Sequence, residues 1–165
     1  LGGLEGGTSV AFASGMAAIA AIFEQLPAGS SVVLADDGYQ GVGGLVQAGV
    51  RQGRWTVRHL AVTDTAGWVE ACGTADLIWL ESMSNPLLAV PDLDVICAAA
   101  RKRGAILGVD NTFATPLNQR PLVLGADVAV QSVTKFIGGH SDLLGGVATA
   151  REPGLVAALR RAREL

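Results

Sequence analysis

One lysine stands out in the stretch SVTKFIGGHSD, because the residues around it are mostly apolar and uncharged. Lys135 follows two hydroxyl side chains, Ser132 and Thr134, at the end of a predicted buried strand. A lysine amine can act as a Schiff-base nucleophile where burial or a nearby cation favours its neutral form. Asp110 ends the preceding predicted strand, where a buried aspartate could hold a proton on a ring nitrogen. A lysine that binds an aldehyde and an aspartate that pairs with a pyridinium are typical of pyridoxal 5'-phosphate sites.

Several other polar residues could hold such a cofactor. The segment Ser14-Gly15-Met16 begins a predicted helix, whose first N–H groups and dipole favour a phosphate. The hydroxyls of Ser132 and Thr134 could donate two further hydrogen bonds. Tyr39 could stack on the ring, and Asn85 could hydrogen-bond the ring oxygen. Each residue alone also fits an ordinary role, such as a helix cap or a turn, so the prediction depends on their convergence.

Strand-like and helix-like segments alternate along the chain. The sequence predicts buried strands at 31–35, 55–62, 75–81, 105–110, 126–132 and 144–150. It predicts helices at 15–26, 40–50, 64–72, 92–103 and from Pro153 onward. Such alternation indicates an α/β fold with a doubly wound, mainly parallel sheet. In these sheets ligands bind beyond the carboxyl ends of the strands, which is where the candidate residues collect.

The composition argues against several classes of function. Half of the 165 residues are hydrophobic and the net charge is −3, which favours a domain with a sizeable core over a nucleic-acid binder. No apolar run is long enough to span a membrane and no leader is recognisable, so we expect no membrane partner. Cys72 and Cys97 lie far apart on predicted helices. Their spacing predicts buried free thiols, no metal site and a cytoplasmic location.

Four segments of the chain resemble one enzyme family. They are SGMAAI at 14–19, ESMSNPLL at 81–88, DNTFATP at 110–116 and SVTKFIGGHSDLLGG at 132–146. All four are similar to the pyridoxal-phosphate enzymes of Cys/Met metabolism, which include cystathionine γ-synthase, the cystathionine lyases, methionine γ-lyase and the homoserine sulfhydrylases. The resemblance covers nearly the whole chain. It implies the large cofactor-binding domain of a fold-type-I pyridoxal-phosphate enzyme, which is a three-layer α/β/α fold.

The resemblance also implies a role for each candidate residue. Lys135 would bind the cofactor covalently and then move the Cα proton of the substrate. Asp110 would pair with the pyridine nitrogen, and Thr112 would lie near the ring. Tyr39 would stack on the ring and act as an acid or base toward the leaving sulfur, while Asn85 would contact the ring hydroxyl or the substrate. The phosphate would be held by Gly15, Met16, Ser132 and Thr134, with Ser14 at the same helix start.

Within the family, the segments favour γ-elimination of cystathionine, with γ-replacement on activated homoserine as the close alternative. Met83 replaces a proline that is usual in this motif. Gly41 stands where methionine γ-lyases usually carry a cysteine, which disfavours that activity. Family chains are much longer, so we expect residues 1–165 to be the large domain without an N-terminal arm and a C-terminal small domain, inactive in isolation. The resemblance further implies an amino-acid substrate and a homotetramer.

Two other interpretations remain open from the residues alone. Ser132-Val133-Thr134-Lys135 matches the S-x-x-K motif of acyl-transfer enzymes. That motif normally begins a helix and needs S-D-N and K-T-G partners, which this sequence lacks. A non-catalytic relative or a nucleotide-binding module is the second alternative, although no G-x-G-x-x-G motif follows a predicted strand.

Overall fold

The structure, a computed structural model, describes residues 1–164, without the side chain of Arg103. Within these residues a seven-stranded sheet runs in the order β1-β7-β6-β5-β4-β2-β3. Its strands are β1 Thr8–Phe12, β2 Ser30–Ala35, β3 Trp55–Leu60, β4 Leu77–Glu81, β5 Ile106–Asp110, β6 Val128–Ser132 and β7 Gly146–Ala150. Five neighbouring strands of the sheet, β6, β5, β4, β2 and β3, are parallel to one another. Strand β7 is antiparallel to both of its neighbours, β1 and β6. The predicted mainly parallel sheet is therefore confirmed.

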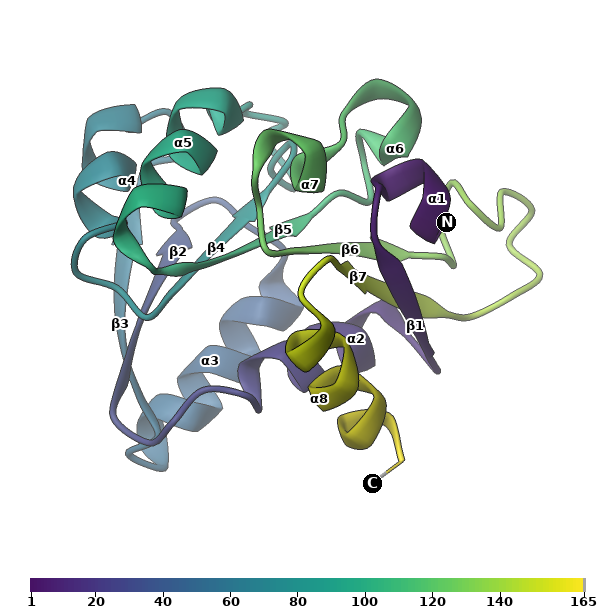
Figure 1. Cartoon of the computed structure of the whole chain (residues 1–165), viewed down its shortest axis with the longest axis horizontal. Helices are drawn as coiled ribbons and strands as arrows, with labels where there is room; N and C mark the ends of the chain where they lie inside the picture. The colour runs from purple at the N-terminus through teal and green to yellow at the C-terminus, as the bar shows by residue number, and fades with distance from the viewer. Residues whose placement is uncertain (165) are drawn as a thin grey trace.

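Helices cover both faces of the sheet (Figure 1). They are α1 Gly2–Glu5, α2 Gly15–Phe23, α3 Gln40–Arg51, α4 Thr65–Ala71, α5 Leu93–Arg103, α6 Thr115–Asn118, α7 Pro121–Leu124 and α8 Pro153–Arg163. Side chains of α2, α3 and α8 form one core cluster with the sheet, and side chains of α4 and α5 form another on the opposite face. This arrangement is the expected three-layer α/β/α fold.

Local signals explain where the long helices begin and end. Ser14 caps α2 because its Oγ accepts a hydrogen bond from the N–H of Ala17 at 3.1 Å. Asp92 caps α5 in the same way through the N–H of Val95, at 3.2 Å. Gly104 ends α5 at a φ of 83°, a left-handed conformation that glycine adopts without a steric cost. Polar caps thus fix the points at which the chain enters and leaves the sheet.

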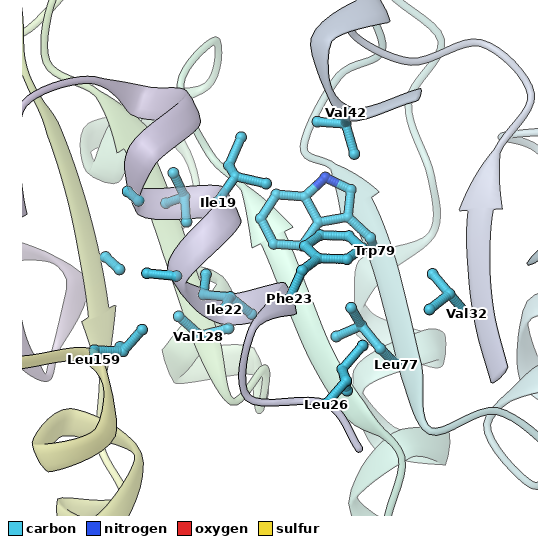
Figure 2. Close-up of a cluster of buried hydrophobic side chains, with 14 of the residues drawn as sticks. Ile19, Ile22, Phe23, Leu26, Val32, Val42, Leu77, Trp79, Val128 and Leu159 are labelled. Atoms are coloured by element: carbon cyan, nitrogen blue, oxygen red, sulfur yellow. The ribbon is translucent and has the colours of Figure 1, made fainter. Parts of the chain in front are cut away.

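The core holds α2 firmly against the sheet. Phe23 of α2 lies beside Trp79 of β4, with ring centroids 5.6 Å apart, and Figure 2 shows this contact among aliphatic side chains that include Ile19 and Ile22. Gly108 of β5 leaves room for the indole, since a Cβ there would lie 2.6 Å from Cε3 of Trp79. Burial of aromatic rings is among the largest contributions to packing. It fixes the helix whose first turn reaches the candidate site.

Some elements differ from the sequence prediction. The helix expected over 15–26 ends at Phe23, and the strand expected over 55–62 ends at Leu60. The sequence analysis did not predict α1, β1, α6 or α7. The three helices are single turns, too short to show helical periodicity. Strand β1 lies at the sheet edge and is mostly half-exposed, so its apolar pattern is weak.

Candidate active site

A cavity of about 360 Å³ lies where the start of α2 meets the carboxyl ends of β4, β5 and β6. All ten residues predicted from the sequence line it: Ser14, Gly15, Met16, Tyr39, Asn85, Asp110, Thr112, Ser132, Thr134 and Lys135. Ile19, Glu81, Met83 and Phe113 complete the lining. The structure therefore brings together residues that the sequence separates by more than half of the chain. Their individual roles stay predictions.

Asp110 is fixed at the end of β5 by Thr112. The N–H and the hydroxyl of Thr112 both donate to Oδ1 of Asp110, at 3.0 Å and 2.5 Å. The Thr112 hydroxyl oxygen in turn accepts the N–H of Ser132 at 2.8 Å, which ties β5 to β6. Burial raises the pKa of the Asp110 carboxyl, and the two hydrogen bonds from Thr112 partly oppose this. None of the ion pairs among residues 1–164 includes Asp110, so a cationic donor in the cavity would find an uncompensated carboxylate.

The first turn of α2 lies against the end of β6. Gly15 is buried, and a Cβ at this position would meet the Cβ of Ser132 at 3.0 Å. Helix geometry leaves the N–H groups of Gly15 and Met16 without acceptors inside the helix. These N–H groups and the positive end of the helix dipole favour an anion such as a phosphate. The hydroxyl of Ser132 lines the same part of the cavity.

Lys135 lies in the segment that follows β6, shown in yellow-green where it extends beyond the sheet (Figure 1). The strand itself is buried as predicted, but the lysine side chain is exposed, so residues 1–164 do not supply the burial that the sequence analysis considered. Thr134 braces the segment, because its hydroxyl oxygen accepts the N–H of Gly145 at 3.1 Å. Lys135 thereby lines the cavity while its side chain stays exposed.

Glu81 is a cavity residue that the sequence analysis left out of the predicted site. It ends β4 beside Asp110 in the parallel register and is only 8% exposed. Its Oε1 accepts the N–H of Tyr39 at 2.5 Å. Burial raises the pKa of Glu81 to about 7, against hydrogen bonds from the backbone of Tyr39 and Asn85, while the charge of Asp110 adds to the rise. Its position at a parallel strand end was the signal that could have identified it.

A buried polar cluster supports the site from behind. Glu5 of α1 is fully buried, and its Oε1 accepts from the amide groups of Gln131, at 2.7 Å, and Asn111, at 3.0 Å. Asn111 follows Asp110 directly and also donates to the carbonyl oxygen of Gln119 at 2.8 Å. The cluster therefore connects α1 to the ends of β5 and β6, next to the residues that line the cavity.

Other kinds of site find little support in the described part of the chain. Among residues 1–164, no group of three or more His, Cys, Asp and Glu side chains is arranged to hold a metal ion. Cys72 and Cys97 are buried and form no disulfide, and burial raises the pKa of Cys97 to about 12. No helix in this range has the length and apolar character needed to cross a membrane.

The fold and the cavity together define a class of protein. A doubly wound sheet with a lysine, an uncompensated buried aspartate and a helix N-terminus around one cavity suits pyridoxal 5'-phosphate, whose aldehyde, ring nitrogen and phosphate need these three partners. Residues 1–164 match the model of the family described as Cys/Met metabolism PLP-dependent enzyme. The chain belongs to this family, as its sequence segments led us to expect.

Individual relatives cover almost the whole chain. A Streptomyces coelicolor protein with a provisional cystathionine γ-lyase name is 46% identical over 99% of this chain and 41% of its own length. A Mycobacterium tuberculosis cystathionine γ-synthase is 44% identical over 86% of this chain and 37% of its own length. CalE6 from Micromonospora echinospora is described both as a methionine γ-lyase and as a cystathionine γ-lyase. Its crystal structure superposes on this chain with a TM-score of 0.92 at 43% identity. The superposition covers 99% of this chain and about 45% of CalE6. The chain thus spans about two fifths of the length of these curated relatives.

Proposed function

We propose that this chain is the cofactor-binding part of a pyridoxal-phosphate enzyme that carries out γ-elimination on cystathionine. The observation that carries the proposal is the convergence of Lys135, Asp110 and the first turn of α2 on one cavity. The names of the S. coelicolor relative and of CalE6 support a γ-lyase. Because the chain spans only part of these relatives, the activity is proposed for the protein at its full length.

Each side chain would have a defined task in this reaction. When bound, the cofactor would supply an aldehyde for covalent attachment and a ring that delocalises negative charge from the substrate Cα. The Nζ of Lys135 would be the point of attachment until the amine of the substrate replaced it there, and the released Nζ would then take the proton from Cα. The Asp110 carboxylate, held by Thr112, would keep a proton on the ring nitrogen. That proton would make the ring a better acceptor for the charge that develops at Cα.

The phosphate and the leaving group would be handled by other residues. The N–H groups of Gly15 and Met16 would bind the phosphate, with the hydroxyls of Ser132 and Thr134 beside them. Tyr39, at the start of α3, would lie over the ring and donate a proton to the departing sulfur. A proton given to sulfur makes it a better leaving group, since a neutral thiol departs more readily than a thiolate.

The second candidate reaction is γ-replacement, in which cysteine attacks an activated homoserine. The M. tuberculosis cystathionine γ-synthase, 44% identical, favours this reaction for the same cavity. Incubation of the full-length protein with cystathionine, or with activated homoserine and cysteine, separates the two by whether cystathionine is consumed or made. Leu117, Phe136 and Leu144 are large apolar side chains that are mostly exposed, which supports the accompanying proposal that copies of the protein assemble into a homotetramer.

Borohydride trapping tests the cofactor site directly. The protein is incubated with pyridoxal 5'-phosphate, reduced and digested, and the adduct is mapped by mass spectrometry. This chain has only two lysines, so Lys102→Ala is a matched control for Lys135→Ala. We expect one adduct on Lys135, lost in Lys135→Ala and retained in Lys102→Ala. An adduct shared between Lys102 and other amines, with none enriched at Lys135, would contradict the proposed function.

A further inference from the structure

Two loops that carry predicted cofactor contacts are joined by one carboxylate. Tyr39 lies in the loop between β2 and α3, and Asn85 lies in the loop between β4 and α5. Glu81 accepts the backbone N–H of Tyr39 at 2.5 Å, and the backbone N–H of Asn85 also stabilises its charged form. Both loops line the cavity through their side chains. Glu81 therefore holds the backbones of the two loops at a common point.

The side chain of Glu81 is closely packed and has no cationic partner among the described residues. The side chain is 8% exposed, and Gly38 approaches so closely that a Cβ there would lie 3.3 Å from its Oε1. It also pairs no cation, since none of the ion pairs among residues 1–164 includes it. A buried carboxylate beside Asp110 is costly to maintain, which points to a gain elsewhere. The groups that it contacts are the backbones of cavity residues.

A second contact between the same loops provides a comparison. The hydroxyl of Ser84 donates to Oδ2 of Asp37, next to the Glu81–Tyr39 contact but without reaching Tyr39 itself. If the loops only needed to be held together, either contact would serve. Glu81 differs because its hydrogen bond ends on Tyr39, a residue that itself lines the cavity at the position directly before α3.

We propose that Glu81 is a positioning residue of the cofactor site, whose carboxylate fixes the backbone of Tyr39 so that the Tyr39 ring is held in place over the cavity. The inference rests on the proposed function, because the ring position matters for binding only if the cavity receives pyridoxal 5'-phosphate. Glu81 acts through Tyr39 and takes no part in proton transfer to the substrate.

A double-mutant cycle tests whether Glu81 acts through Tyr39. In the full-length protein, Glu81→Met keeps the side-chain size but removes the acceptor, and loss of a hydrogen bond to a charged group corresponds to about a tenfold rise in the Kd for pyridoxal 5'-phosphate. Glu81→Gln keeps a carbonyl oxygen for the Tyr39 N–H, so its Kd should stay within about threefold of wild type. In a Tyr39→Ala background the effect of Glu81→Met should largely disappear, because the ring that it positions is absent.

Ser84→Ala is the control for the double-mutant cycle. Ser84→Ala removes the other contact between the loops, so its effect on the Kd should be the same with and without the Tyr39 side chain. If Glu81→Met raises the Kd equally in both backgrounds, or leaves it unchanged in wild type, the proposal is wrong.

Amide hydrogen exchange gives a readout that needs no cofactor. In Glu81→Met the peptide that contains Tyr39 should exchange faster than in Glu81→Gln, because only the former lacks an acceptor for the Tyr39 N–H. Asp127→Asn is the control for changing a carboxylate that accepts a backbone N–H elsewhere. Asp127 accepts the N–H of Leu107 at 2.7 Å and does not line the cavity, so this variant should leave the exchange of the Tyr39 peptide unchanged. Equal exchange in the two Glu81 variants would overturn the positioning role even if trapping at Lys135 succeeds. Failure of trapping with the expected exchange would instead contradict the proposed function alone.

Discussion

Replacing Glu81 by glutamine should change how the stability of this protein depends on pH. Burial raises the pKa of Glu81 to about 7 from its ordinary value of 4.5. The folded state therefore prefers the protonated side chain. The resulting contribution to the free energy of unfolding is fully present below pH 4.5 and is lost as the pH rises to about 7. Glutamine does not titrate, so this loss is absent in Glu81→Gln.

The size of the effect follows from the same two values. At about 1.4 kcal/mol per pH unit, the interval from 4.5 to about 7 corresponds to about 3 kcal/mol. The free energy of unfolding of Glu81→Gln, relative to wild type, should rise by about this amount between pH 4.5 and pH 7.5 and then level off. Glu81 as a whole residue is only 8% exposed, so solvent screening reduces the effect little.

Urea unfolding followed by tryptophan fluorescence at a series of pH values measures this difference. Asp110 and Asp37 raise the pKa of Glu81 through their charges, Lys135 lines the same cavity, and His59 lines a smaller cavity that Glu81 also borders. These groups are present in both proteins, so most of their own titration cancels in the difference. Glu24→Gln is a control of opposite sign, because the hydrogen bond from Arg54 lowers the pKa of Glu24. Its effect should be far smaller, since that ion pair is exposed.

A difference that stays constant from pH 4.5 to pH 7.5 would refute the reasoning. It would mean that Glu81 titrates alike in the folded and unfolded states, and therefore that water reaches the carboxyl in the folded protein. A difference that changes in the opposite direction would mean that its hydrogen bonds outweigh its burial.

Three further substitutions should alter stability in the same urea assay. Glu5→Ala leaves the buried amide of Gln131 without its acceptor and should lower the free energy of unfolding by about 3 kcal/mol; an effect below that of an exposed substitution would mean that the cluster is hydrated. Gly108→Ala places a Cβ 2.6 Å from the ring of Trp79, so a loss of about 1–3 kcal/mol and an altered near-UV circular dichroism spectrum are expected. Ser14→Ala removes the cap of α2 and should cost about 1 kcal/mol, with an unchanged stability counting against the cap.

The sequence was sufficient to predict most of the sheet and the composition of the cavity. Residues such as Asp110 and Ser132 end buried apolar strands, and their positions can be read from local pattern alone. Because parallel strands point the same way, their carboxyl ends meet at one edge, so residues far apart along the chain could be assigned to one site. Ser14 was found in the same way, since a capping residue before an alanine-rich run is a local signal.

Tertiary structure alone decided the contacts that depend on long-range pairing. Strand β1 exists because it pairs with β7, as the Ser9–Thr149 hydrogen bond across 140 residues illustrates. Oε1 of Glu5 accepts a hydrogen bond from Gln131, 126 residues away, and Oε1 of Glu81 accepts one from the Tyr39 backbone. The residues next to Glu5 and Glu81 in the sequence do not identify these partners. A glutamate reads the same in a sequence whether its carboxylate is buried or exposed. By itself the sequence therefore determined which strand ends and helix starts carry the chemistry, whereas only the folded chain decided which carboxylates are buried and what they hold in place.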